Sequence, residues 1–134
     1  MPFVEIFAPS GAVPEEQRDR ISSRVATETN SAAGLPDTEE VRAMSWLVWW
    51  DVDHWYVGGI RTTADEPPRY VVRITTAEGA LDSEKRAEIV NRVVAALAVD
   101  DERDRFDRQP DGRSAAWVQF IEVARDKQCL STSG

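Results

Sequence analysis

A strand-like run, a helix and a second strand-like run follow one another twice along the sequence, and this repetition limits the possible folds more than any other feature. The segments of the first half are residues 3–8, 14–32 and 40–50, and those of the second half are residues 69–75, 82–98 and 115–123. Each crossover is long enough to return the chain to a parallel neighbouring strand. The sequence therefore predicts an α/β (α+β) fold, in which tandem β-α-β units form a four-stranded sheet with two helices on one face.

The ends of these segments carry residues that suit helix starts and turns. Pro14 fits the first turn of the first helix. Asp82 or Ser83 caps the second helix. Between the two halves, residues 54–60 are typical of a short hairpin and residues 61–68 of a linker.

The chain of 134 residues suits a single domain with its own core. Its pseudo-repeats are residues 1–60 and 69–123, followed by a tail at residues 124–134. A sheet with both helices on one face leaves the other face bare, and tryptophan and valine recur in its strands. We therefore expect other subunits to cover this face in a closed oligomer.

Composition excludes several partners and kinds of site. A net charge of −8 argues against binding to nucleic acid or to an anionic membrane. One histidine and one cysteine rule out a His/Cys zinc cluster. No run of ~18 apolar residues could span a membrane, and residues 1–30 show no signal peptide. The lone Cys129 cannot form an internal disulfide, which fits a reducing cytoplasm.

The strongest chemical candidate stands at the start of the chain. Pro2 precedes the apolar run, and a small second residue such as proline normally allows Met1 to be removed. Pro2 would then carry a secondary amine, and an α-amino group has an ordinary pKa near ~7.7–8.0. Burial among apolar residues lowers that pKa toward the range of a general base. The alternative is that proline is simply tolerated at this position.

Four short motifs occur in an order and spacing that resemble the tautomerase superfamily: Pro2, Gly34-Leu-Pro, Val41-Arg42 and His54-Trp-Tyr-Val-Gly-Gly59. The unit that begins at Pro2 resembles the 4-oxalocrotonate tautomerase type. The tandem arrangement resembles its fused members, the malonate semialdehyde decarboxylase and cis-3-chloroacrylic acid dehalogenase families. The resemblance covers the chain to about residue 123. It implies a tautomerase/MIF-like fold, an enzyme without metal or other cofactor, and a homotrimer, because three fused chains equal six single units.

The resemblance also implies roles for individual residues. Pro2 matches the catalytic proline of the family, and Arg42 falls where a strand arginine binds and polarises the substrate's oxygens. Glu39 lies near the carboxylate that activates water in the decarboxylase-like members. Trp55 matches a hydrophobic phenylalanine, and Gln119 falls near a strand tyrosine of the dehalogenase.

Two loops depart from the pattern, since residues 9–13 and 75–80 lack the arginines of the relatives. Arg73 is therefore the second candidate for binding substrate after Arg42, and Trp117 completes the predicted substrate-binding residues. Each has an alternative role: Arg42 in a surface ion pair with the acids that precede it, Arg73 in an edge or interface salt bridge, and Trp117 in the core or a subunit interface.

We predict a cytoplasmic, cofactor-free tautomerase (isomerase). Pro2 is its general base, and its substrate is a small enol or 2-oxo acid that carries a carboxylate. One alternative is a hydratase-type dehalogenase or decarboxylase, in which Pro2 stays protonated and a carboxylate activates water. Another is an oligomeric member of the superfamily that has lost catalysis, as the missing loop arginines suggest.

Overall fold

The structure is a computed structural model that describes residues 2–98 and 116–124. Cys129 and most of the tail at residues 124–134 lie outside these residues. The elements are, in chain order, β1 (Phe3–Pro9), α1 (Glu15–Ala32), α2 (Glu39–Ala43), β2 (Leu47–Val52), β3 (Tyr56–Val57), β4 (Ile60–Arg61), β5 (Tyr70–Ala77), α3 (Ser83–Leu97) and β6 (Ala116–Val123).

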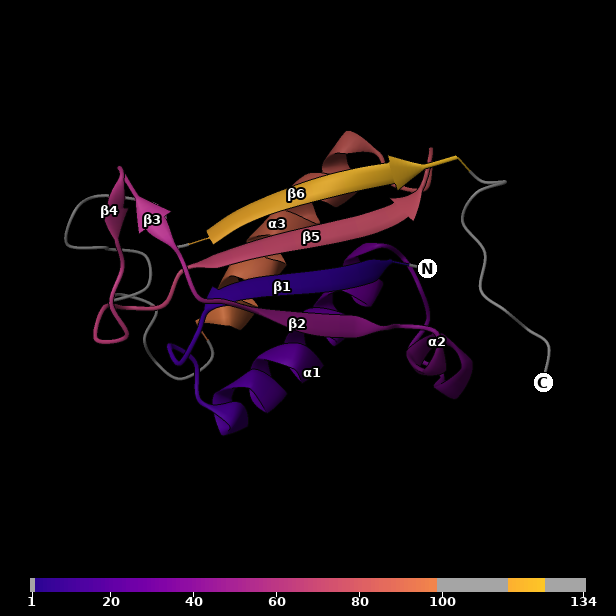
Figure 1. The fold of residues 1–134 in the computed structure, drawn as a ribbon. Helices are drawn as coiled ribbons and strands as arrows, with labels where there is room; N and C mark the ends of the chain where they lie inside the picture. Colours follow the sequence, from indigo (N-terminus) through magenta and orange to yellow (C-terminus); the bar gives the residue numbers. More distant parts are fainter. Residues whose placement is uncertain (1, 99–115, 125–134) are drawn as a thin grey trace.

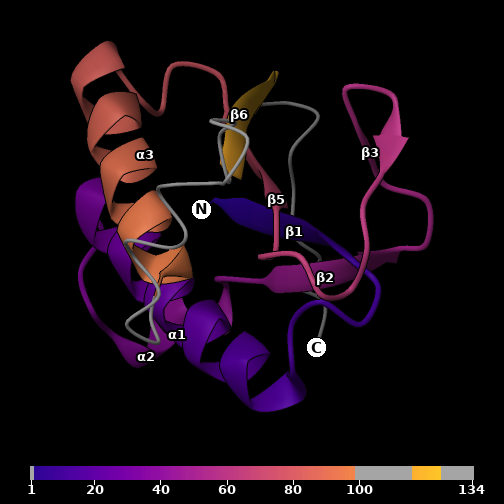
Figure 2. The same cartoon turned by 90° about the vertical axis from the view of Figure 1, so that its left-hand side faces the viewer.

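Four strands form one sheet in the order β2-β1-β5-β6 (Figure 1). β1 is parallel to β2, β5 is parallel to β6, and the two central strands β1 and β5 are antiparallel. Seen from the side, α1 and α3 both lie on one face of this sheet (Figure 2). The predicted pair of β-α-β units in a four-stranded sheet with both helices on one face is therefore confirmed.

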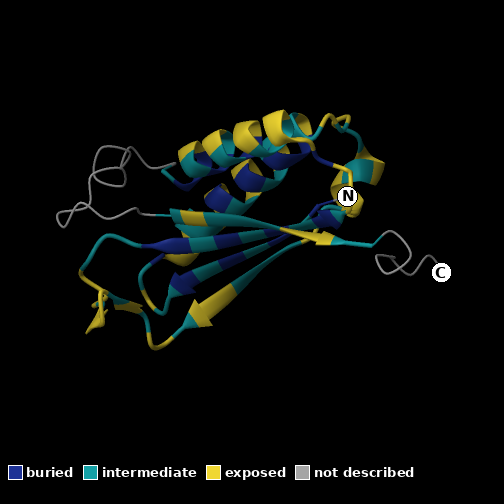
Figure 3. Cartoon of the chain, turned by 90° about the horizontal axis from the view of Figure 1, so that it is seen from above, coloured by how far each residue is buried: buried dark blue, intermediate teal, exposed yellow. Residues whose placement is uncertain are grey.

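The core lies between the sheet and the two helices. Burial alternates strictly along β1 and β5, as expected for strands with one covered face. The covered face of these strands meets the buried stripes of α1 and α3, and Figure 3 shows buried residues where the two layers meet. The main contributors are Val4, Ile6, Val72 and Ile74 from the sheet, and Ile21, Val25, Ile89 and Val93 from the helices. Each such side chain stabilises the fold by about 1.5–3 kcal/mol relative to an exposed one.

The prediction of a single strand over residues 40–50 is wrong for the first half of that segment. The structure has the short helix α2 there, and β2 begins only at Leu47. The Thr38 side chain accepts a hydrogen bond from the Val41 N–H at 3.2 Å and so caps the helix. Glu39 and Glu40 lie in the first turn, where negative charge is favourable. This local capping outweighs the strand preference of the Trp- and Val-rich sequence that follows.

The predicted hairpin is present as β3 and β4, and it lies on the side of the sheet away from the helices (Figure 2). Gly58 and Gly59 connect the two strands with φ angles of 60° and 79°. Two successive positive φ angles favour glycine over other residues. The Thr62 N–H donates to the Trp55 carbonyl at 2.9 Å and closes the base of the hairpin.

The sheet face opposite the helices, here called the open face, carries large apolar side chains. Trp46, Trp50 and Trp117 are exposed by 60%, 50% and 70%. By the register of the strands they share this face with the alternate residues Phe3, Glu5 and Phe7 of β1 and Val71, Arg73 and Thr75 of β5. The described part of the chain leaves at least half of each of these tryptophans exposed.

Candidate active site

Pro2 is buried and lies just before the central strand β1. The Val4 N–H donates to the Trp46 carbonyl at 3.1 Å, which fixes β1 against β2. The parallel register begins at Val4 and Leu47, and extending it two steps back sets Pro2 beside Ser45. One step back in the antiparallel register with β5, Pro2 lies opposite Thr76. The chain start is therefore enclosed between two strand neighbours.

Polar side chains surround this end of the sheet, and none of them was predicted from the sequence as a site residue. Ser45 Oγ accepts a hydrogen bond from Asn30 Nδ2 at 2.7 Å and donates to the Val41 carbonyl at 2.6 Å. Asn30 belongs to the last turns of α1 and Val41 to α2, so Ser45 links these two helices just before β2 begins. Thr29 and Thr76 are 1% and 2% exposed, and neither hydroxyl has a hydrogen-bond partner among the described residues. A threonine at a core-facing strand position was the signal available in the sequence.

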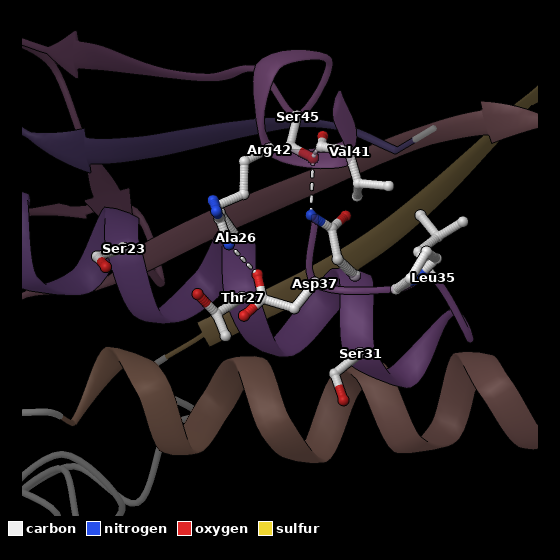
Figure 4. A pocket seen from close by; sticks show the side chains of 11 residues that line it. Ser23, Ala26, Thr27, Ser31, Leu35, Asp37, Val41, Arg42 and Ser45 are labelled. Atoms are coloured by element: carbon white, nitrogen blue, oxygen red, sulfur yellow. Dashed lines mark hydrogen bonds and ion pairs between the residues drawn. The ribbon is translucent and has the colours of Figure 1, made fainter. Parts of the chain in front are cut away.

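A cavity of about 530 Å³ opens between α1 and α2 (Figure 4). Ser45 belongs to its lining and, when the β1–β2 register is extended, is also the neighbour of Pro2. Arg42 and Asp37 also line the cavity and form an ion pair, and their side chains point toward each other in Figure 4. The other lining residues are Ser23, Ala26, Thr27, Asn30, Ser31, Leu35, Pro36 and Val41.

The predicted residues Arg42 and Glu39 both belong to α2, at the same end of the sheet as Pro2. The Arg42 side chain is 58% exposed, and its partner is Asp37 rather than the acids at positions 39 and 40. Glu39 is exposed in the first turn of the helix. An exposed ion pair of this kind contributes only about 0–1 kcal/mol, so the Arg42 guanidinium can exchange its partner easily.

Arg73 and Gln119 lie together on the open face, away from Pro2. They are paired across β5 and β6. The Arg73 guanidinium lies 3.9 Å from a Glu5 oxygen and 5.1 Å from the centre of the Phe7 ring. The same Glu5 carboxylate accepts a hydrogen bond from the Trp50 indole at 3.0 Å. Within one chain, Arg73 therefore already has an anionic neighbour and does not approach Pro2.

Trp55 and Trp117 lie at the opposite end of the sheet from Pro2. They line a cavity of about 240 Å³ beneath the hairpin, together with Val57, Arg69, Tyr70, Val71 and Ala116. Arg69 donates to Glu66 at 2.9 Å, with its side chain 8% exposed. The structure thus separates the predicted residues into three places: Pro2 with α2, the open face, and this hairpin cavity.

Over residues 2–98 and 116–124, no cluster of His, Cys, Asp and Glu is arranged to hold a metal ion. No helix in these ranges has the length and apolar character needed to cross a membrane.

The pKa of Arg92 on α3 is raised, mainly because its side chain donates a hydrogen bond to Glu88, with further attraction from Glu88 and Glu28 that outweighs desolvation. Glu28 is thereby engaged in a contact between the helices, at 3.3 Å from Arg92.

Comparison with known proteins identifies the fold. No protein-family model and no curated protein matches the sequence. Among solved structures, the macrophage migration inhibitory factor of Toxoplasma gondii is 15% identical with a TM-score of 0.67, and the alignment covers 97% of this chain and 96% of that one. A wild-type fused 4-OT, described as an asymmetric trimer, is 13% identical with a TM-score of 0.70, over 96% of this chain and 91% of that one.

A third structural neighbour is N1, a member of the cis-3-chloroacrylic acid dehalogenase family. It is 12% identical with a TM-score of 0.69, and the alignment covers 96% of this chain and 79% of that one. These proteins are members of the tautomerase superfamily, whose activities include tautomerisation, dehalogenation and decarboxylation. The agreement extends over nearly the whole chain, including the tandem units. The chain therefore has the mixed α+β fold of the tautomerase superfamily.

Proposed function

We propose that this protein is a cofactor-free tautomerase in which Pro2, freed of Met1, is the general base. The observation that carries the proposal is the position of Pro2, which is buried just before the central strand in a fold shared with fused 4-OT. Val4 and the polar side chains of Ser45 and Asn30 surround this end of the sheet. Partial desolvation of this kind disfavours an ammonium ion and lowers the pKa of an amine.

The proposed reaction moves one proton. The neutral Pro2 amine removes a proton from a carbon or enol oxygen conjugated with a carbonyl, and the resulting ammonium returns it to another atom of the conjugated system. Negative charge develops on the substrate's oxygens during the first transfer. A cation beside those oxygens stabilises that charge. Arg42 is the best-placed candidate, because α2 leads directly into the strand neighbour of Pro2.

Arg73, Trp55, Trp117 and Gln119 can join the Pro2 site only from another copy of the chain, because they lie on the open face or at the far end of the sheet. We propose a homotrimer for this reason and because fused 4-OT is described as a trimer. A substrate carboxylate would then meet Arg42 from the same chain or an arginine from a neighbour. Guanidinium suits a carboxylate because it can bind both oxygens.

A hydratase-type reaction is the second candidate function. Glu39 and Arg42 are one turn apart on α2, so a carboxylate that activates water and a cation that holds the substrate lie close to each other. In that reaction Pro2 acts as an acid and must be protonated. The pH dependence of kcat/KM separates the two reactions: activity rises with the loss of the Pro2 proton for a tautomerase and falls for a hydratase.

The decisive experiment is the Pro2→Ala variant, assayed for ketonisation of a 2-hydroxydienoate after intact-mass analysis has shown that Met1 is absent. We expect an unchanged circular dichroism spectrum and a loss of at least ~10²-fold in kcat/KM, the scale of a positioned base. Wild-type turnover in Pro2→Ala would exclude Pro2 as the base. Met1 retained in the purified protein would favour a non-catalytic member of the fold.

A further inference from the structure

Thr76 is a buried polar residue that the proposed reaction leaves without a role. Its side chain is 2% exposed, and Oγ1 has no hydrogen-bond partner among the described residues. A buried hydroxyl without a partner has given up its hydrogen bonds to water and gained none in return. Valine has nearly the same shape and would avoid this loss. Packing alone therefore gives no reason for a threonine at this position.

The register of the central strands places Thr76 beside Pro2. Phe3 pairs with Thr75, so the next step of the antiparallel register sets Pro2 opposite Thr76. The Val4 N–H points to β2, so the even-numbered residues of β1 form the non-hydrogen-bonded pairs with β5. Side chains are closest in such pairs, with Cβ atoms about 4.5–5.5 Å apart. Pro2 and Thr76 are both buried, and by this register they are neighbours on the helix-covered face.

We propose that Thr76 is a positioning residue for the Pro2 amine, an inference that rests on the proposed function of Pro2. Once Met1 is removed, the Pro2 nitrogen gains an N–H, and Thr76 Oγ1 accepts a hydrogen bond from it. A neutral secondary amine has one N–H and one lone pair. A hydrogen bond that holds the N–H therefore also sets the direction of the lone pair that takes the substrate's proton.

Neighbouring charged groups do not compete for the Thr76 hydroxyl. Glu122 lies opposite Thr76 on β6, but its Oε1 accepts a hydrogen bond from Arg86 of α3 at 2.6 Å. Glu78 is exposed in the turn after β5, where its backbone N–H donates to the Val123 carbonyl at 2.8 Å. On the β2 side, Arg42 and Asp37 form an ion pair with each other. These groups act equally on the amine in every variant below.

The test measures the Pro2 amine directly. The full chain is labelled with ¹⁵N-proline, and the Pro2 amine resonance is titrated by NMR in wild type, Thr76→Val, Thr76→Ala and Thr76→Ser. An accepted hydrogen bond favours the ammonium more than the neutral amine. We therefore expect Thr76→Val and Thr76→Ala to lower the pKa of Pro2 by at least about half a unit, and Thr76→Ser to keep the wild-type value.

Kinetics and stability complete the experiment. Thr76→Val should lower Tm only slightly, because the proposed hydrogen bond is lost while the side chain keeps nearly the same shape. It should also lower kcat by about tenfold or more with little change in KM, as expected when a positioned base is lost. The control is Thr75→Val, on the same strand but facing away from the helices. This control should change neither the pKa of Pro2 nor kcat.

The outcomes separate this inference from the proposed function. A Pro2 titration that is identical in wild type, Thr76→Val and Thr76→Ala overturns the role of Thr76, even where Pro2→Ala abolishes turnover. A lowered Pro2 pKa in Thr76→Val and Thr76→Ala, restored in Thr76→Ser, supports the role even where no enol is turned over by any form. Rescue of kcat by Thr76→Ser supports both.

Discussion

At the scale of single residues, Arg42 takes part in the proposed reaction only by leaving Asp37. The two side chains are 58% and 79% exposed, so their ion pair contributes about 0–1 kcal/mol and a substrate carboxylate can displace Asp37 at small cost. Asp37→Asn should remove this competition. We expect a KM for an anionic enol that is lower by about two- to fivefold, with kcat nearly unchanged, in steady-state kinetics at low salt.

The control for this prediction is the Arg42→Ala background. Without the guanidinium there is no ion pair with Asp37. Adding Asp37→Asn to Arg42→Ala should therefore leave KM unchanged. High salt should also reduce the difference between wild type and Asp37→Asn, because both side chains are exposed to solvent. A KM that is the same in Asp37→Asn and wild type at low salt would show that Arg42 does not bind the substrate's carboxylate.

The sequence predicted some residues of the site and missed others for physical reasons. Pro2 could be placed before a buried strand because the apolar run that follows it is local information. The pairing of Arg73 with Glu5 depends on the antiparallel register of β5 and β1, which no short-range pattern specifies. The same register brings Thr76 to Pro2. The position of Trp55 at the far end of the sheet follows from the path of the hairpin.

At the scale of elements, the two β-α-β units carry the same arginine contact at the start of their long helices. Arg18 donates to the Val13 carbonyl at 3.1 Å and pairs with Asp51 of β2 at 2.5 Å. Arg86 donates to the Leu81 carbonyl at 3.1 Å and pairs with Glu122 of β6 at 2.6 Å. Each contact joins the start of a helix to an outer strand.

The two contacts should differ in strength. Arg18 is 18% exposed and its guanidinium lies 4.9 Å from the centre of the Trp49 ring, whereas Arg86 is 40% exposed. A partly buried arginine over a tryptophan gains cation–π attraction that an exposed one lacks. We expect Arg18→Ala to lower the free energy of unfolding by about 1–2 kcal/mol and Arg86→Ala by about 0–1 kcal/mol in urea titrations. Equal losses would show that the ring contact contributes nothing.

The internal repeat also explains how well the elements could be predicted. Ile21 and Val25 of α1 are separated from Ile89 and Val93 of α3 by the same spacing that separates Arg18 from Arg86. Long helices and buried strands with such periodicity are visible in the sequence, and all of them were found. The five-residue helix α2 has no buried stripe. It depends on the cap at Thr38. The Trp and Val residues of this region favour a strand and so give no indication of the helix.

At the scale of the whole molecule, the open face indicates how copies of the chain associate. The helices cover one side of the sheet (Figure 2), and by the strand register the exposed tryptophans lie on the other side. Several exposed tryptophans on one face of a sheet are typical of a subunit interface. At its centre, Glu5 and Arg73 are near each other and the Trp50 indole is bonded to Glu5, so the polar groups there are already engaged within one chain.

The proposed homotrimer can be tested by placing a charge on this face. Trp117 is 70% exposed at the start of β6, so Trp117→Glu should leave the fold of one chain intact while making burial against another copy costly. We expect wild type to sediment as a trimer at micromolar concentration in analytical ultracentrifugation, and Trp117→Glu to sediment mainly as a monomer. Ala87→Glu, which adds the same charge at an exposed position of α3, is the matched control and should remain a trimer. A Trp117→Glu protein that stays trimeric would place the interface away from the start of β6, and a monomeric wild type would contradict the proposal that neighbouring chains complete the Pro2 site.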